Sequence, residues 1–433
     1  MRFALCLFVL VSFAVAPVRA LAAGPGDANP SVQELLERVQ ILERRIDELE
    51  RRQQAGQTDA VAAAAPATGS AAVPPPHEHP TPVSAGHEAP AEPQYPMVGF
   101  HGFTNIDFSA QDKKGTRSGF SMGQFVFHMS GALSDKVSYF GELSLTATSS
   151  GYNAEVERSL IRYAYNDHLK VSFGRYHTPI NYWNTAFHHG LWLQTTVSRP
   201  EMIQFGGRLI PVHFVGALIE GSIPRTGSLN LNYNVGLGNG RGSIISRGGD
   251  AGDNNNNRAW LVTLYARPDW AYGWQVGGSA YRDKINIEGF RFINGGIFPS
   301  NTNFSEWIES AHLVYAKENP ELLAEFANIR HSGRTTPGVF NSQAWYVQLA
   351  YRVPWLEKAW KPYYRFEYIH IPKSDPVFNP VSTSPLPSLA GSVVGLRYDI
   401  SSYAAIKAEY RNSRRAPDQP RVNGVFVQTS LTF

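Results

Sequence analysis

Strict alternation of apolar and polar residues dominates positions 97–433 and limits that region to β-structure. Between positions 228 and 235, leucine, tyrosine and valine alternate with serine and asparagine. Successive side chains of a strand point to opposite faces, so one face of this segment is apolar and the other polar. Sixteen such segments are centred near Thr104, Val126, Leu143, Ile161, Val171, Ala217, Leu231, Val262, Val276, Leu313, Ala324, Val347, Phe366, Leu396, Ala408 and Thr429. We therefore expect an all-β fold, a 16-stranded antiparallel transmembrane β-barrel.

The connections between these segments alternate in length. Short connections are expected at residues 134–136, 166–168, 224–227, 268–273, 318–320 and 401–403. Long loops are expected at residues 177–202, 238–258, 284–304 and 371–390. Short turns at one end and long loops at the other are typical of a transmembrane barrel. A soluble β-sandwich is the main alternative, but it has no need for the aromatic residues that end many apolar faces.

The N-terminus resembles a secretory signal. Arg2 precedes a 14-residue apolar run, and the run leads to a small residue, Leu21 and another small residue. Residues 1–22 are therefore expected to be a signal peptide. The chain's single cysteine, Cys6, lies inside it, so the mature protein has no thiol chemistry. Export together with a barrel predicts a location in the outer membrane of a Gram-negative bacterium, in contact with its lipid.

Residues 31–54 carry a heptad pattern that predicts a periplasmic coiled coil. Its core positions are Val32, Leu35, Val39, Leu42, Ile46 and Leu49. An amphipathic helix on a globular domain would need a wider apolar stripe. β-branched residues at heptad position a with leucine at position d favour a coil of two helices. The repeated pattern of arginine, two core residues and glutamate favours a coil of three helices. We expect a trimer. The alanine- and proline-rich residues 55–96 then predict a disordered linker.

Several strand motifs resemble the phosphate-selective porin family of O and P type. They include Phe173 to Pro179, Glu321 to Phe326, Pro362 to Tyr368 and Val394 to Asp399. The resemblance implies a homotrimer of 16-stranded barrels with one loop folded into each pore. No dense run of lysine and arginine is present, so phosphate and carboxylates both remain open as solutes. The terminal Phe433 is similar to the signal read by the barrel assembly machinery.

Basic residues outnumber acidic residues in positions 97–433 by 32 to 25. Alternation assigns charged side chains of both signs to the inner face of the barrel. The pore-lining candidates are Arg162, Lys170, Arg175, Arg267, Arg352, Arg365, Arg397, Lys407, Arg411, Glu142, Glu325, Glu367 and Glu409. Their positive excess predicts a preference for small anionic solutes. Pairing between neighbouring strands, such as Arg365 with Glu409, would weaken that preference.

The expected loop at residues 177–202 is unusually aromatic. Its constriction candidates are Tyr182, Trp183, Phe187, His188, His189 and Trp192. We expect it to fold inward, with contact to another subunit or the membrane rim as the alternative. Adjacent histidine side chains usually diverge, so no metal site is predicted.

The sequence offers few residues suited to an enzyme centre. His128 and Ser130 share a strand face but stand about 7 Å apart, too far for a base to activate a nucleophile. No enzyme activity, cofactor or nucleic-acid partner is predicted. The sequence indicates a passive outer-membrane porin. The alternative is a structural envelope protein whose barrel is an anchor and whose coiled coil reaches towards the cell wall; a channel would conduct ions, and an anchor would not.

Overall fold

A computed structural model gives the fold of the C-terminal part of the chain. The described residues are 95–205, 208–242, 245, 248–253, 255–293, 296–333, 337–357, 359–379, 386–416 and 419–433, with the backbone alone for 287–302. The predicted signal peptide, coiled coil and nearly all of the linker lie outside these residues. Among the described residues, no helix is long and apolar enough to cross a bilayer.

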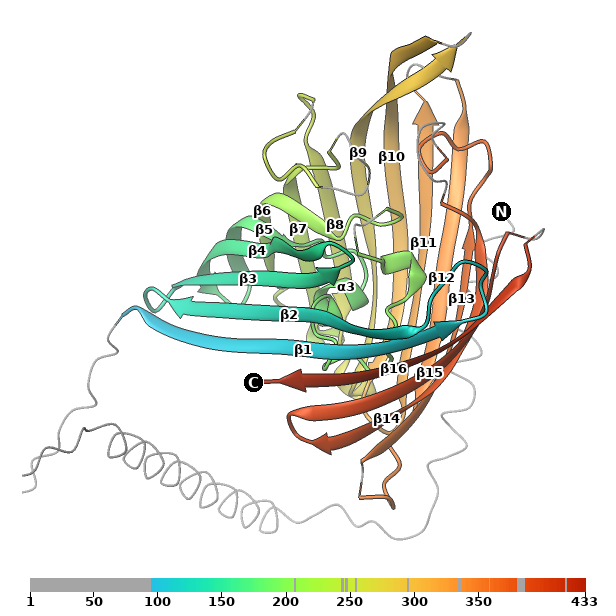
Figure 1. The fold of residues 1–433 in the computed structure, drawn as a ribbon. Coiled ribbons are helices and arrows are strands. Elements are labelled where there is room, and N and C mark those ends of the chain that lie inside the picture. Colours follow the sequence, from blue (N-terminus) through green and yellow to red (C-terminus); the bar gives the residue numbers. More distant parts are fainter. Residues whose placement is uncertain are drawn as a thin grey trace, which may run out of the picture. The chain divides into compact units, whose positions relative to one another are not determined.

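Sixteen antiparallel strands close into one barrel (Figure 1), in which each strand pairs with its neighbours in sequence and β1 pairs with β16. Their bounds are β1 (Met97–Gln111), β2 (Gly119–Ala132), β3 (Val137–Thr148), β4 (Gly151–Asn166), β5 (Leu169–His177), β6 (His213–Ser222), β7 (Leu231–Asn239), β8 (Ala259–Ala266), β9 (Trp274–Ile293), β10 (Gly296–Ala316), β11 (Glu321–Gly333), β12 (Val339–Ala350), β13 (Trp360–His370), β14 (Leu389–Ser401), β15 (Ala404–Arg415) and β16 (Arg421–Thr432). All sixteen predicted centres lie in sixteen different strands, which confirms the predicted barrel. A two-sheet sandwich is excluded.

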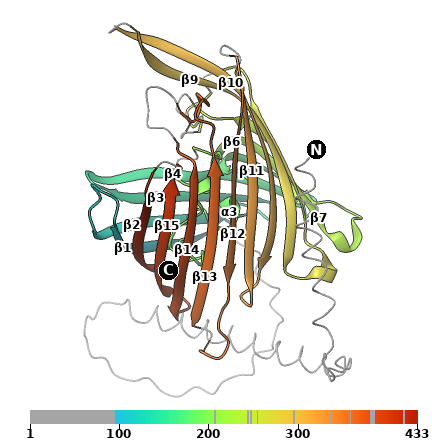
Figure 2. The ribbon, with the colours of Figure 1, turned by 90° about the vertical axis from the view of Figure 1, so that its right-hand side faces the viewer.

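Besides the end of the long loop after β5, two predicted boundaries are wrong. The alternating segment at 228–235 becomes a strand only at Leu231, because a 3₁₀ turn, η3 (Gly227–Leu229), and a left-handed Asn230 precede it. The expected loop at 284–304 is instead the end of a long hairpin, in which β9 and β10 stay paired to Ile293 and Gly296. Figure 2 shows this hairpin rising beyond its neighbours. Alternation continues through these residues, but their polar composition resembles that of a loop.

The two faces of the barrel follow the period of two. In β13, Lys361, Arg365 and Glu367 are buried, whereas Tyr364 and Tyr368 are exposed. A closed barrel has only an inside and an outside, so the buried set points inward and the aromatic set points outward. This is the arrangement expected of strands whose outer face meets lipid.

The connection after β5 is the longest, and it fills part of the interior. It runs over residues 178–212, which is further than the predicted 177–202, and contains α3 (Trp183–Phe187) and the 3₁₀ turn η2 (Glu201–Ile203). We call residues 178–212 the inner loop. Figures 1 and 2 both show α3 within the ring of strands.

Gly174 in β5 supports the close pairing of β4 and β5. Its φ is +136°, and a Cβ there would lie 2.1 Å from the carbonyl oxygen of Ser159. Gly174→Ala is therefore expected to lower the free energy of unfolding by at least about 2 kcal/mol, measured by urea unfolding in lipid vesicles. Gly119→Ala is the control, because nothing lies within 4 Å of its Cβ. Equal losses for the two variants would contradict the expectation.

Candidate functional site

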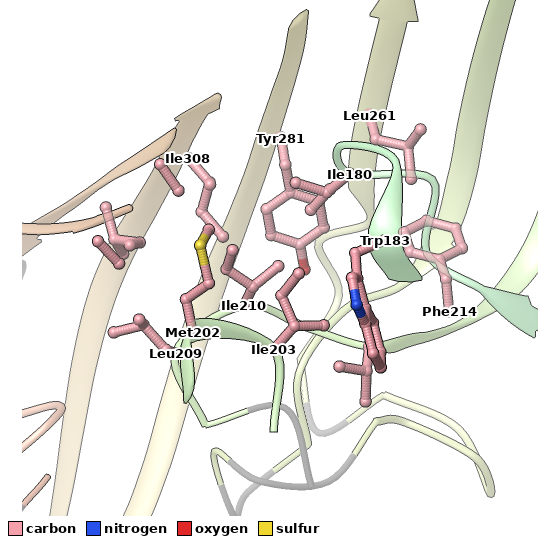
Figure 3. Packing of buried hydrophobic residues seen from close by; sticks show 14 of the residues in the cluster. Ile180, Trp183, Met202, Ile203, Leu209, Ile210, Phe214, Leu261, Tyr281 and Ile308 are labelled. Atoms are coloured by element: carbon pink, nitrogen blue, oxygen red, sulfur yellow. The ribbon is translucent and has the colours of Figure 1, made fainter. Parts of the chain in front are cut away.

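Apolar contacts hold one side of the inner loop against the barrel wall. Trp183, Ile203 and Ile210 of the loop are each 1% exposed and belong to one cluster with Leu261 of β8 and Tyr281 of β9. Figure 3 shows these side chains meeting between loop and wall. Each fully buried large apolar side chain contributes about 1.5 to 3 kcal/mol. The aromatic composition of the loop is thus explained by burial inside the barrel.

Three basic side chains of β13, β14 and β15 donate hydrogen bonds to carbonyl oxygens of the inner loop. Arg365 of β13 reaches the carbonyl oxygens of Ser198 at 2.9 Å and Arg199 at 3.2 Å. Arg397 of β14 reaches those of Trp192 at 2.7 Å and Gln194 at 3.0 Å. Lys407 of β15 reaches those of Leu191 and Thr196.

Three acidic side chains complete this attachment by accepting loop amides. Glu325 accepts the amides of Tyr182 at 2.9 Å and Trp183 at 2.6 Å. Glu409 accepts the amides of Val197 at 3.0 Å and Ser198 at 3.2 Å. Glu367 accepts the amide of Glu201 at 2.6 Å.

Six pore-lining candidates are therefore covered by the inner loop. Each is at most 5% exposed: Arg365, Arg397, Lys407, Glu325, Glu367 and Glu409. Alternation assigned them to the inner face, but it carries no information about a loop that covers that face. In this structure they bind the loop and do not contact open water.

The other candidates are mostly paired. Arg162 lies 3.1 Å from Glu220, Arg175 lies 3.1 Å from Asp250, and Arg411 lies 2.5 Å from Glu409. Lys170 lies 3.9 Å from Asp167, Arg352 pairs with Glu318 and Asp399, Glu142 pairs with Arg158, and Arg267 bonds Gln275. Arg365 pairs with Glu367 at 2.7 Å and reaches Glu409 only through Ser198.

The constriction candidates occupy different depths in the loop. Trp183, His188 and His189 are buried, whereas Tyr182, Phe187 and Trp192 are partly buried. The two histidines meet His177 and His213, which sequence reasoning missed because they lie at the two ends of the loop. Burial, and then the neighbouring His177, hold the pKa of His188 well below its usual range. Burial also lowers the pKa of the loop residue Arg199 to about 9.

Phe433 lies at the closure of the barrel. Its backbone exchanges hydrogen bonds with Gly102 of β1, at 2.8 Å and 3.1 Å. Its ring is 56% exposed and lies 5.6 Å from that of Phe125 on the outer surface. The last residue is thus part of the β1 and β16 seam, and its role as an assembly signal stays a prediction.

Comparison with known proteins gives likeness of fold. No protein-family model and no curated protein sequence matches the chain. The anion-selective porin from Comamonas acidovorans is 12% identical, with a TM-score of 0.55, over 78% of this chain and 100% of that one. The trimer form of OmpT from Vibrio cholerae is 14% identical, with a TM-score of 0.52, over 78% and 100% of the chains.

A third solved structure shares the same fold. The Salmonella typhi OmpF complex with daunomycin is 13% identical, with a TM-score of 0.52, over 78% of this chain and 97% of that one. Outer-membrane porins are therefore structural neighbours of this 16-stranded barrel. At these identities the likeness shows the fold alone.

Proposed function

We propose that this chain is a porin of a Gram-negative outer membrane, which passes small anionic solutes by passive diffusion. The observation that carries the proposal is a closed barrel whose charged inner face is only partly covered by the inner loop. The side chains of Arg158, Arg162 and Arg411 are 25%, 37% and 29% exposed. Water therefore reaches the inner face beside the loop, as a channel requires and a sealed anchor does not.

The exposed ends of these ion pairs support anion preference. The partner side chains of Arg158 and Arg411, which are Glu142 and Glu409, are both 0% exposed, and Glu220 beside Arg162 is 23% exposed. At these three pairs, solutes therefore meet guanidinium groups more than carboxylates. Positive groups lining a narrow aqueous channel raise the local anion concentration. Nearer the strand ends, Glu155 and Glu318 are more exposed than their arginine partners, so the preference is weak, and phosphate and carboxylates remain the candidate solutes.

A homotrimer in lipid completes the proposal. The outer face of the first strands exposes Phe100, Phe120, Tyr152 and Phe173, which are 56% to 82% exposed in the single chain. Lipid or a second barrel would remove this surface from water. The sequence-based coiled coil, placed in the periplasm, would join three chains in register. The barrel assembly machinery is the expected partner during insertion.

Reversal potentials in a potassium chloride gradient test the proposal. The wild-type channel is expected to prefer chloride, and Arg162→Gln is expected to reduce that preference by about half, because it removes the most exposed of the three guanidinium groups. Arg162 and Glu220 are both partly exposed, so folding should change little.

Arg258→Gln is the matched control, because it removes one positive charge from the connection between β7 and β8. It is expected to leave the reversal potential unchanged. A potassium-preferring wild-type channel would contradict anion selectivity. Absence of any conductance in folded, inserted protein would instead favour the structural envelope protein.

A further inference from the structure

Four histidines come together where the inner loop leaves the barrel wall. His177 ends β5 and pairs with His213, the first residue of β6, so the two residues lie side by side at the ends of the loop. His188 and His189 follow α3 in the middle of the loop. One ring nitrogen from each of the four lies within 4.8 Å of the other three. Residues separated by 36 positions thus converge on one point.

The ring nitrogens of the cluster are buried, and three of them have no hydrogen-bond partner. His177, His188 and His189 are 7%, 2% and 3% exposed. Among the described residues, Nε2 of His177, Nε2 of His188 and Nδ1 of His189 have no hydrogen-bond partner, whereas Nε2 of His189 and Nε2 of His213 face a carboxylate. An unsatisfied buried polar group costs about 1 to 3 kcal/mol, and native structures rarely contain several together. A shared cation would satisfy these nitrogens at once.

His188 is oriented as a metal ligand would be. Its Nδ1 lies 2.7 Å from Oδ1 of Asn184. The amide nitrogen of Asn184 donates to the carbonyl oxygens of Thr178 and Val212, both at 2.9 Å. That arrangement fixes Oδ1 as the acceptor, so Nδ1 of His188 carries the proton and Nε2 presents its lone pair to the cluster. Outer contacts of this kind orient metal-binding histidines in general.

A β-bulge supplies a carboxylate beside the cluster. The pairing of β3 with β4 passes from Arg158 to Val156 without a partner for Glu157. The extra residue re-aims the side chain, and Oε2 of Glu157 lies 3.0 Å from Nε2 of His189 and 2.9 Å from Nε2 of His213. Its other oxygen accepts a hydrogen bond from Ser144 at 2.7 Å. Glu157 thus provides negative charge beside the cluster, which favours a cation at this point.

We propose that His177, His188, His189 and His213 bind one divalent transition-metal ion, Zn²⁺ or Cu²⁺, and that this ion fastens the middle of the inner loop to the ends of β5 and β6. Imidazole suits these ions, whereas Mg²⁺ and Ca²⁺ prefer oxygen ligands. Nitrogens at 2.0 to 2.1 Å from a tetrahedral ion stand about 3.4 Å apart. The largest spacing of 4.8 Å then closes by about 1.4 Å on binding. The proposal concerns the loop and does not depend on conduction.

Zinc binding by the full mature chain tests this site. His77, His79 and His87 are other histidines that could bind zinc, so all proteins carry glutamine at those positions. After treatment with chelator, calorimetry and elemental analysis with Zn²⁺ alone are expected to find one ion per chain. His188→Gln and His189→Gln are each expected to weaken binding at least about 100-fold. Co²⁺ in place of Zn²⁺ is expected to give the intense visible absorption of a tetrahedral site.

His168→Gln is the matched control, because His168 lies in an exposed turn and contacts Ser222. It is expected to bind Zn²⁺ like the parent. Absence of stoichiometric binding of both Zn²⁺ and Cu²⁺ by the folded parent protein would overturn the proposal without the need for any variant. Zinc affinities of His188→Gln and His189→Gln equal to that of the parent protein would overturn it as well.

Discussion

Replacing the inner loop, residues 178–212, by the dipeptide Asn-Gly is expected to raise single-channel conductance at least about threefold. His177 and His213 are already paired across β5 and β6, so a two-residue turn can close this hairpin. The replacement removes the chain that covers Arg365, Lys407 and their neighbours, and water takes the place of the loop as their hydrogen-bond partner. Sixteen-stranded barrels without a plug enclose a wide aqueous channel.

A second shortened protein is the control, because it shows whether a shorter chain alone changes the conductance. Replacing residues 290–299 by the same dipeptide shortens the β9 and β10 hairpin beyond the paired residues Gly289 and Ser300. This hairpin projects beyond the neighbouring strands in Figure 2. Its removal is expected to leave conductance unchanged in planar bilayers. Unchanged conductance after removal of the inner loop would show that the loop does not limit the pore.

The strands could be predicted because their signal is local. A period of two is written in each segment, and sixteen centres from Thr104 to Thr429 each fall in a strand. The same signal fixes which side chains face inward, as β13 illustrates. Strand ends could be predicted less well. The alternation of residues 228–235 starts before β7 does, because the left-handed backbone of Asn230 delays the strand and polarity gives no sign of that conformation.

The contacts of the inner face could not be predicted, because they depend on residues far apart in sequence. Glu325 bonds Tyr182 across 143 positions, and Glu409 bonds Val197 across 212. Nothing near Glu325 or Glu409 in the sequence distinguishes a loop contact from a pore-lining group. The histidine cluster is similar, because His213 gains its meaning only when β6 pairs with β5. The adjacent pair at 188 and 189 was the one available signal, and its rings lie 4.4 Å apart.

Arg365→Met is expected to lower the free energy of unfolding by about 3 to 5 kcal/mol and to make the open channel fluctuate. Arg365 is 0% exposed, and its guanidinium bonds Glu367, Gln348 and the loop residues Thr196 and Ser198. Removing one member of a buried ion pair leaves the other charge uncompensated, which is the source of that cost. Urea unfolding in lipid vesicles and the variance of single-channel current provide the two measurements.

A double variant that also removes Glu367 distinguishes the cost of an uncompensated buried charge from the cost of detaching the inner loop. Replacing Arg365 and Glu367 together by methionine removes the uncompensated carboxylate, so part of the lost stability is expected to return. The current is expected to keep fluctuating, because the carbonyl oxygen of Ser198 still lacks its partner in the wall and the amide of Glu201 has lost its partner as well. Arg415→Met is the control, since its pair with Glu201 is 40% and 26% exposed and should cost less than about 1 kcal/mol. A loss for Arg365→Met as small as that of the control would mean that the hydrogen bonds of Arg365 do not stabilise the attachment of the inner loop.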